Sequence, residues 1–209
     1  MSDLRFTSLR RGQRSNGVPP MLRVQNLSVR VGIRHVLEKI NLELYDGDAM
    51  LVSGPNGSGK STLLNAIAGL EPAEVKSGTI MMEGREITDA APHERAEAGL
   101  AYLRQRENVF PSLSVAENLR LTVGPSGHDQ FKETYPEWAA DLPPQKRASL
   151  LSGGQRQKLA WAMATLRQGR LLLADEPEAG LSERLQIPEG ITCLVVSHSP
   201  ETFLEDESP

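Results

Sequence analysis

Short apolar runs alternate along the chain with longer stretches in which apolar residues have helical spacing. Strands are predicted at Leu22–Val31, Ile40–Leu44, Ala49–Ser53, Thr79–Met82 and Leu100–Leu103. Leu171–Ala174 and Cys193–Val196 are continuous apolar runs, which are typical of strands covered on both faces. Because helical patterns separate several of these runs, we predict an α/β domain with a mainly parallel central sheet.

The segments outside this pattern are polar. Residues 1–20 are rich in arginine, glycine and proline, and they lack the apolar core of a signal peptide. We predict that they form a flexible basic extension and that a single folded domain spans residues 21–209. Residues 124–144 contain several prolines among polar residues, which favours a peripheral lobe or loop.

Composition and charge exclude several classes of protein. The 209 residues are 39% hydrophobic and 24% charged, as in an ordinary globular domain, and no run approaches the roughly 18 apolar residues of a spanning helix. Lysine and arginine number 23 against 27 acidic residues, so no nucleic-acid partner is expected. The single cysteine, Cys193, excludes an internal disulfide and favours a reducing, cytoplasmic location.

A glycine-rich loop stands between a predicted strand and a predicted helix. Its residues match the phosphate-binding pattern G-x-x-x-x-G-K-[ST] and are Gly54, Pro55, Asn56, Gly57, Ser58, Gly59, Lys60, Ser61 and Thr62. Backbone N–H groups of such a loop surround phosphate oxygens, Lys60 reaches the terminal phosphates, and the Ser61 hydroxyl can ligate Mg²⁺. A nucleoside triphosphate is therefore the expected ligand, although kinases, GTPases, helicases and transport ATPases share this motif.

A second glycine turn occurs in the sequence LSGGQ, which ends at Gln155 and precedes a helical pattern. Ser152 is a suitable helix cap, and Gly153 and Gly154 leave backbone N–H groups open, so the turn could form a second anion-binding nest. A turn of this kind taken alone is more often a plain capped helix start.

Two predicted strands end in chemically useful side chains. Asp175 and Glu176 follow one strand, where Asp175 can hold Mg²⁺ and Glu176 can polarise an attacking water. His198 follows the next strand and could contact a γ-phosphate, although a lone histidine at a strand end is usually structural.

The order of these motifs resembles that of the ATP-binding cassette (ABC) ATPases. The series is the phosphate loop, Gln105 at a strand end, LSGGQ, LLLADEP and then Ser197–His198, and it covers most of residues 21–199. The resemblance implies a P-loop NTPase fold with a mainly parallel central sheet, an antiparallel β edge and a small helical lobe at about residues 106–160. It also implies a head-to-tail homodimer, or a heterodimer with another ABC subunit.

The resemblance further implies a role for each motif residue. ATP and Mg²⁺ are the implied cofactors, with each ATP between the phosphate loop of one subunit and residues Ser152, Gly153, Gly154 and Gln155 of the other. Glu176 is implied as the catalytic base, His198 as the switch histidine, and Gln105 as the residue that joins the metal to the lobe. Ser61, Gln105 and Asp175 are the implied metal ligands. Residues 178–182 resemble the segment that crosses the dimer interface.

Three segments are similar to ATP-binding subunits of branched-chain amino-acid and urea importers. They are residues 99–105, residues 109–119 and Tyr135–Pro136. ATPases that export lipopolysaccharide share much of this pattern. We expect a subunit that hydrolyses ATP to power a separate membrane permease, which would hold it at the inner face of the cell membrane. Two alternatives stay open: a soluble ABC ATPase without a transport role, and a degenerate regulatory or heterodimer-partner domain with little turnover.

The sequence departs from the family pattern at three places. Val31 stands where relatives carry an aromatic residue that stacks on adenine, and Tyr45 is a possible substitute. Leu181–Ile191 is too short for the helix that usually precedes the switch strand, so a bare connection is expected. The sequence ends eleven residues after His198, where relatives usually continue.

Overall fold

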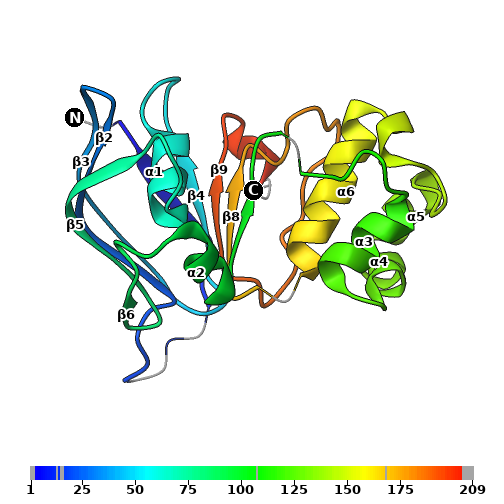
Figure 1. The fold of residues 1–209 in the computed structure, drawn as a ribbon, viewed down its shortest axis with the longest axis horizontal. Coiled ribbons are helices and arrows are strands. Elements are labelled where there is room, and N and C mark those ends of the chain that lie inside the picture. The colour runs from blue at the N-terminus through cyan, green and yellow to red at the C-terminus, as the bar shows by residue number, and fades with distance from the viewer. Residues whose placement is uncertain (1–2, 13, 15–16, 107, 168, 204–209) are drawn as a thin grey trace, which may run out of the picture.

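An antiparallel sheet, a mainly parallel sheet and a helical lobe follow one another along the longest axis of the computed structural model (Figure 1). The structure describes residues 3–12, 14, 17–106, 108–167 and 169–203. The strands are β1 (Arg5–Arg10), β2 (Leu22–Val31), β3 (Arg34–Leu44), β4 (Ala49–Ser53), β5 (Glu74–Met82), β6 (Arg85–Glu86), β7 (Leu100–Leu103), β8 (Leu171–Asp175) and β9 (Cys193–Val196). The helices are α1 (Lys60–Ala68), α2 (Pro92–Glu97), α3 (Val115–Val123), α4 (Gly127–Thr134), α5 (Pro136–Asp141) and α6 (Gly153–Leu166), with short 3₁₀ turns at Ala148–Leu150 and Pro200–Thr202.

The central sheet has the strand order β1-β4-β9-β8-β7, in which β4, β9, β8 and β7 are parallel. Successive residues of its buried strands face opposite sides. Leu171 and Leu173 of β8 belong to the apolar cluster shared with the antiparallel sheet, whereas Leu172 and Ala174 belong to the cluster shared with the lobe. Both faces of β8 are therefore covered, which confirms the interpretation of its continuous apolar run.

The antiparallel sheet has the order β3-β2-β5-β6 and packs against helix α1. This helix contacts β2, β3 and β5 on one side and β8 on the other, so it lies between the two sheets (Figure 1). Its buried residues include Leu63, Leu64 and Ile67, all in the apolar cluster between the sheets. The fold class predicted from the sequence, with an antiparallel β edge beside a mainly parallel sheet, is confirmed.

Helices α3 to α6 form the lobe on the other side of the central sheet (Figure 1). Its interior contains fully buried Phe131 and Trp161, and Trp138 stacks on Tyr135 with ring centroids 4.8 Å apart. The Tyr135 hydroxyl lies 2.7 Å from the Thr165 hydroxyl, which ties the start of α5 to α6. Residues 124–144 thus fold as part of this lobe rather than as a loop.

The N-terminal segment differs from its prediction. Residues 5–10 of the expected flexible extension form β1, which pairs antiparallel with β4 from Arg5 opposite Ser53 to Arg10 opposite Ala49. The reason is the free edge of β4, which offers backbone partners to any strand able to reach it. Five residues of the predicted extension, 1–2, 13 and 15–16, lie outside the described residues.

Arg10 fixes β1 to the sheet. Its guanidinium donates to the backbone carbonyls of Gly47 (3.0 Å), Ile187 (3.2 Å), Pro188 (3.0 Å) and Ile191 (2.6 Å). The last three belong to the connection that leads into β9. This connection contains no helix, as its length predicted.

Among the residues that the structure describes, no helix has the length and apolarity needed to cross a bilayer.

Candidate functional site

The phosphate-binding pattern folds as a loop between β4 and α1. Leu63 N donates to Gly59 O at 2.9 Å, which begins α1 at the end of the loop. Gly59 has φ +99°, and a Cβ at this position would lie 2.6 Å from the Leu37 side chain. Only glycine therefore fits where the helix begins.

Lys60 lies buried at the first position of α1. Its ammonium group donates to Gly54 O (2.8 Å) and Pro55 O (3.2 Å) and contacts His198 Nδ1 (3.4 Å). Burial lowers the pKa of Lys60, and the nearby carboxylates of Glu176 and Asp175 oppose this shift. The cation is thus held inside the loop that the pattern predicts to bind phosphates.

Ser61 and Asp175 form an oxygen pair beside this loop. The Ser61 hydroxyl donates to Asp175 Oδ1 at 3.2 Å, and Asp175 is buried at the end of β8. Burial raises the pKa of Asp175, while the Ser61 hydrogen bond acts in the opposite direction. A hydroxyl next to a carboxylate is a donor set that suits a hard cation such as Mg²⁺, so these residues fit the metal that the motif implies.

Glu176 lies at the point where three motifs meet. Its Oε2 accepts from Gln105 Nε2 at 2.6 Å, and its Oε1 lies 2.6 Å from His198 Nε2. The residue has a left-handed backbone, with φ +49°, a conformation that costs energy outside glycine and is found at functional sites. The structure therefore brings Gln105, Glu176, His198 and Lys60 into one connected chain of side chains.

Both ring nitrogens of His198 have a partner. The Lys60 ammonium can only donate, so a hydrogen bond in that contact uses Nδ1 as the acceptor. On the other side of the ring, Nε2 lies 2.6 Å from Glu176 Oε1. The imidazole is in this way oriented between a cation and a carboxylate.

The LSGGQ turn lies at the start of α6. Ser152 accepts from Gln155 N at 3.1 Å, and Gln155 Oε1 accepts from Ser152 N at 3.1 Å, so the two side chains cap the helix reciprocally. A Cβ at Gly153 would meet no atom within 4 Å, which shows an open backbone there. Within the described part of the chain, no hydrogen bond joins this turn to residues 54–62.

Two long-range contacts of α1 were missed by sequence reasoning; the first lies near Asp175, and the second lies at the end of α1 away from Lys60. The Tyr102 hydroxyl of β7 donates to Asn65 Oδ1 of α1 at 3.1 Å, and burial with nearby Asp175 raises the pKa of Tyr102. Arg95 of α2 is buried and donates to the backbone carbonyls of Ala66 and Ile67 at the end of α1. Neither contact had a local signal, because each joins segments distant in sequence.

Tyr45 does not substitute for the adenine-stacking aromatic residue that Val31 replaces. It precedes β4, whereas the phosphate loop follows β4, so the two lie at opposite ends of that strand. Its ring lies under the Arg14 guanidinium, 4.0 Å from the centroid. The cavity next to the loop, of about 260 Å³, is instead lined by residues of β3 that include Arg34, His35 and Val36.

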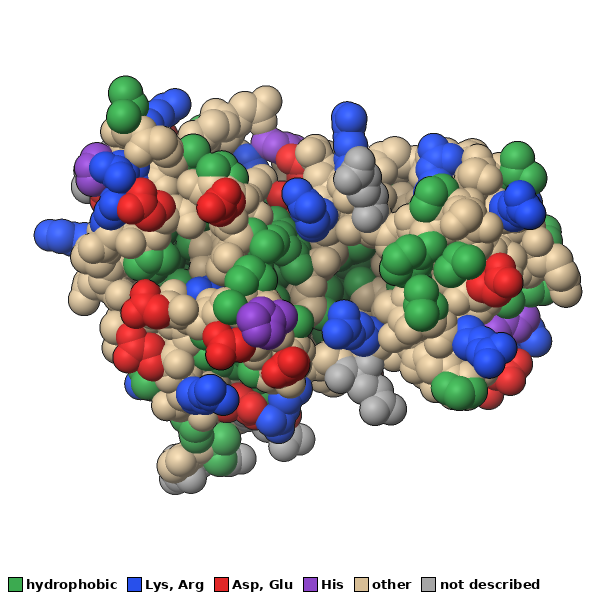
Figure 2. Space-filling model, in the orientation of Figure 1, with side chains coloured by type: hydrophobic (Ala, Val, Ile, Leu, Met, Phe, Trp, Pro, Cys, Tyr) green, Lys and Arg blue, Asp and Glu red, His purple; other side chains and the backbone are tan. Residues whose placement is uncertain are grey.

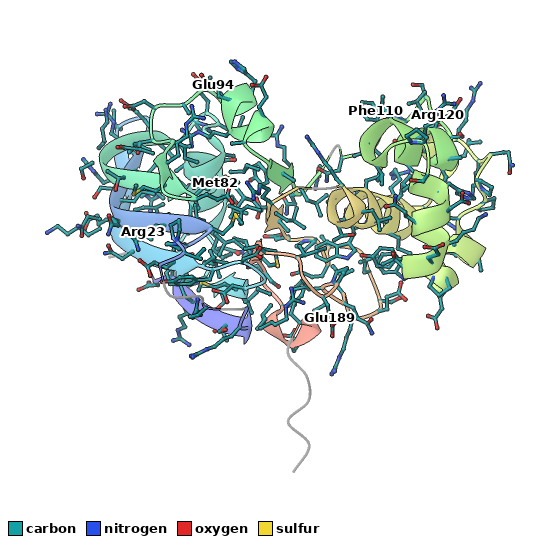
Figure 3. All side chains as sticks on the ribbon, turned by 90° about the horizontal axis from the view of Figure 1, so that it is seen from below. Arg23, Met82, Glu94, Phe110, Arg120 and Glu189 are labelled. Atoms are coloured by element: carbon teal, nitrogen blue, oxygen red, sulfur yellow. The ribbon has the colours of Figure 1, made fainter. Side chains whose placement is uncertain are left out.

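A second cavity, of about 490 Å³, lies between the central sheet and the lobe. Residues of β7, α3, α6 and the loop between β7 and α3 line it. Half-exposed Phe110 belongs to that loop, and well-exposed Leu121 belongs to α3. Figure 2 shows a hollow between the two halves of the molecule, with hydrophobic side chains in it and basic side chains around it. Phe110 lies at the surface of the lobe, on the same side as Arg120 of α3 (Figure 3).

Comparisons with known proteins identify relatives of this chain. A family model described as "ABC transporter" matches residues 37–179. The chain is 40% identical over 171 residues to an Archaeoglobus fulgidus protein named "Probable branched-chain amino acid transport ATP-binding protein LivF", an alignment that covers 78% of this chain and 71% of that protein. It is 37% identical over 171 residues to the "Ribose import ATP-binding protein RbsA" of Streptococcus agalactiae serotype V, which covers 77% of this chain but 34% of that protein.

A solved structure with a similar fold is the dimeric post-hydrolysis state of an ATP-binding cassette bound to ADP and Pi. It aligns with a TM-score of 0.69 at 26% identity and covers 88% of this chain and 92% of that one.

Proposed function

The chain belongs to the ABC transporter family and is an ATPase of that family, and from this premise we propose that it is the subunit whose ATP hydrolysis drives a separate membrane permease. The observation that carries the proposal is the series of side-chain contacts that runs from Lys60 through His198 and Glu176 to Gln105. These contacts bring together a cation for phosphate binding (Lys60), a proton acceptor (Glu176) and a residue of the segment that leads from β7 into the lobe (Gln105).

The chemistry assigns a task to each of these groups. Lys60 and the loop N–H groups would bind the β- and γ-phosphates, and Glu176 would accept a proton from the attacking water. His198, held between Lys60 and Glu176, would orient that carboxylate and contact the γ-phosphate. Ser61 and Asp175 would hold Mg²⁺, which supplies charge neutralisation to the phosphates when bound.

The LSGGQ turn supports a dimeric enzyme. Its backbone is open at Gly153, and none of its hydrogen bonds in the described part of the chain reaches the phosphate loop of the same chain. A second copy, or a related ABC subunit, placed head to tail would supply this nest to the nucleotide. A dimeric state of a similar cassette, bound to ADP and Pi, agrees with such pairing.

The permease would dock at the cavity between the central sheet and the lobe. The cavity has a mixed polar and apolar lining, and the exposed apolar side chains of Phe110 and Leu121 suit an amphipathic helix. Strand β7 leads from there to Gln105. Docking would hold the protein at the cytoplasmic face of the membrane. The cargo that we propose is an amino acid, supported by the branched-chain amino-acid protein; the ribose protein shows that related cassettes serve other cargo.

The test is the oligomeric size of purified Glu176→Gln protein, measured by light scattering with and without Mg²⁺ and ATP. Because the amide cannot accept the proton but preserves the shape, ATP should bind, persist and produce a shift from monomer to dimer. Unmodified protein should hydrolyse ATP and show only a transient shift. Glu189→Gln, a change in the exposed connection to β9, is the matched control (Figure 3).

Three results would contradict the proposal. Normal turnover by the Glu176→Gln protein would exclude Glu176 as the base. Tight ATP binding without dimerisation would favour a regulatory or heterodimer-partner domain. A dimer that hydrolyses ATP but is not recovered with any membrane protein would favour a soluble ABC ATPase without a transport role.

A further inference from the structure

Glu178 connects the two segments that carry the candidate base and the switch histidine. It stands two positions after Glu176, at the start of residues 178–182. Its Oε1 accepts a hydrogen bond from the hydroxyl of Ser197, the residue before His198. Its Oε2 is buried without a hydrogen-bond partner among the described residues.

The hydroxyl of Ser197 both donates and accepts a hydrogen bond. Besides donating to Glu178, it accepts from Ser199 N at 2.8 Å. Ser197 is fully buried, and its backbone N–H donates to Val52 O of β4 at 3.2 Å. These bonds bracket His198 on both sides, so the direction of the imidazole depends on a turn that Glu178 helps to hold.

A carboxylate at this place is costly for the fold. Burial raises the pKa of Glu178, and the Ser197 hydrogen bond only partly offsets that effect. An apolar side chain of similar size would fill the space without burying an unpartnered oxygen. The cost points to a task that needs an acceptor aimed at Ser197.

We propose that Glu178 is a positioning residue for His198, acting through the Ser197 hydroxyl and so linking residues 178–182 to the γ-phosphate side of the site. This inference rests on the proposed ATPase function. If residues 178–182 lie at the dimer interface, a shift of that segment on dimer closure moves the acceptor of Ser197 and reorients the imidazole between Lys60 and Glu176.

The experiment is a double-mutant cycle on the full chain, with kcat from phosphate release and Kd from a fluorescent ATP analogue. Glu178→Ala and Ser197→Ala should each lower kcat by about 10-fold or more and leave Kd within about threefold. Glu178→Gln keeps the accepting oxygen and should restore kcat to within about threefold of the unmodified protein. In the His198→Ala background, adding Glu178→Ala should cause no further loss of kcat, because the residue acts through the missing imidazole.

A second readout does not depend on turnover. The ¹⁵N NMR resonances of the His198 imidazole should shift in Glu178→Ala and Ser197→Ala and stay unchanged in the control Glu189→Ala. Thermal unfolding identifies a variant that fails to fold, and Ser197→Ala, which removes a single oxygen, then carries the test.

The two possible failures are distinguishable. Absence of turnover in the unmodified chain would overturn the proposed function, while the imidazole spectrum would still report on the Glu178 link. The positioning role alone would be overturned if the losses of kcat from Glu178→Ala and His198→Ala multiplied in the double variant. It would also be overturned if neither Glu178→Ala nor Ser197→Ala changed the imidazole spectrum.

Discussion

The Nζ atom of Lys60 lies 3.4 Å from Nδ1 of His198, although 138 residues separate them in the sequence. The contact follows from the pairing of β4 and β9, which places Val52 beside Val196 in parallel register. Residues that follow neighbouring parallel strands emerge at the same edge of the sheet. Residues 54–62 and His198 are thus brought together by the pairing of the strands that precede them.

Lys60→Ala should abolish useful nucleotide binding. Removing the buried cation to which we assign the terminal phosphates is expected to weaken ATP binding by about 2–5 kcal/mol, or roughly 30-fold or more. Isothermal titration calorimetry with Mg²⁺-ATP measures this directly. Lys132→Ala, which removes an exposed lysine of α4, is the matched control. Binding of ATP to Lys60→Ala within threefold of the unmodified protein would exclude the assigned role of Lys60.

The parallel strands of the central sheet could be predicted because their signals are local. Continuous apolar runs marked β8 and β9, and the motif residues after them had to meet because parallel strands end at one edge. The predicted geometry around Ser61 and Asp175 follows from the same rule. The individual roles of these residues in catalysis stay predictions.

The parts that sequence reasoning missed depend on distant partners. The six residues of β1 have a weak pattern and include two arginines. The strand exists because β4 offers an unpaired edge and Arg10 binds carbonyls near residue 190. Arg95 is a charged residue in a short helix, and its burial depends on the end of α1 lying beside it. No periodicity contains this information, because the partner that fixes each residue lies elsewhere in the chain.

Arg95→Met should destabilise the fold. The guanidinium donates to four backbone carbonyls at 2.7–2.9 Å and packs on Gly69, where a Cβ would lie 2.8 Å from its central carbon. Methionine fills part of the space but removes the side-chain donor from these four carbonyls, at an expected cost of about 2–4 kcal/mol. Urea denaturation followed by circular dichroism measures the loss. The exposed Arg85→Met should change the unfolding free energy by less than about 0.5 kcal/mol; an equal loss in both variants would mean that the carbonyl contacts of Arg95 do not stabilise α1.

Arg10→Ala should loosen the N-terminal strand and the connection into β9 together. The side chain ties Gly47 to Ile187, Pro188 and Ile191, so its removal is expected to cost about 1–3 kcal/mol. For a chain of this size that corresponds to a fall in Tm of roughly 2–10 °C. Differential scanning calorimetry gives the shift, with Arg5→Ala in the same strand as the control. If residues 1–20 behaved as a detached extension in solution, neither variant would change Tm.

Asn118→Ala should disturb the lobe surface at which we propose that the permease docks, without impairing basal hydrolysis. The Asn118 side chain is fully buried; its oxygen accepts from Phe110 N at 2.7 Å, and its amide donates to the carbonyls of Phe110, Leu113 and Ser114. Alanine leaves these backbone groups without that partner, so the segment that presents Phe110 should open more readily.

Hydrogen exchange measures this opening at the Phe110 amide, which should exchange at least about tenfold faster in Asn118→Ala. Phosphate release by the isolated protein should stay within about threefold, because none of the Asn118 contacts reaches Glu176 or Lys60. Gln130→Ala, on the exposed face of α4, is the control and should change neither quantity. Faster exchange accompanied by an equal loss of basal turnover would show that this segment is part of the hydrolytic site itself, and the separation of docking from chemistry would then be wrong.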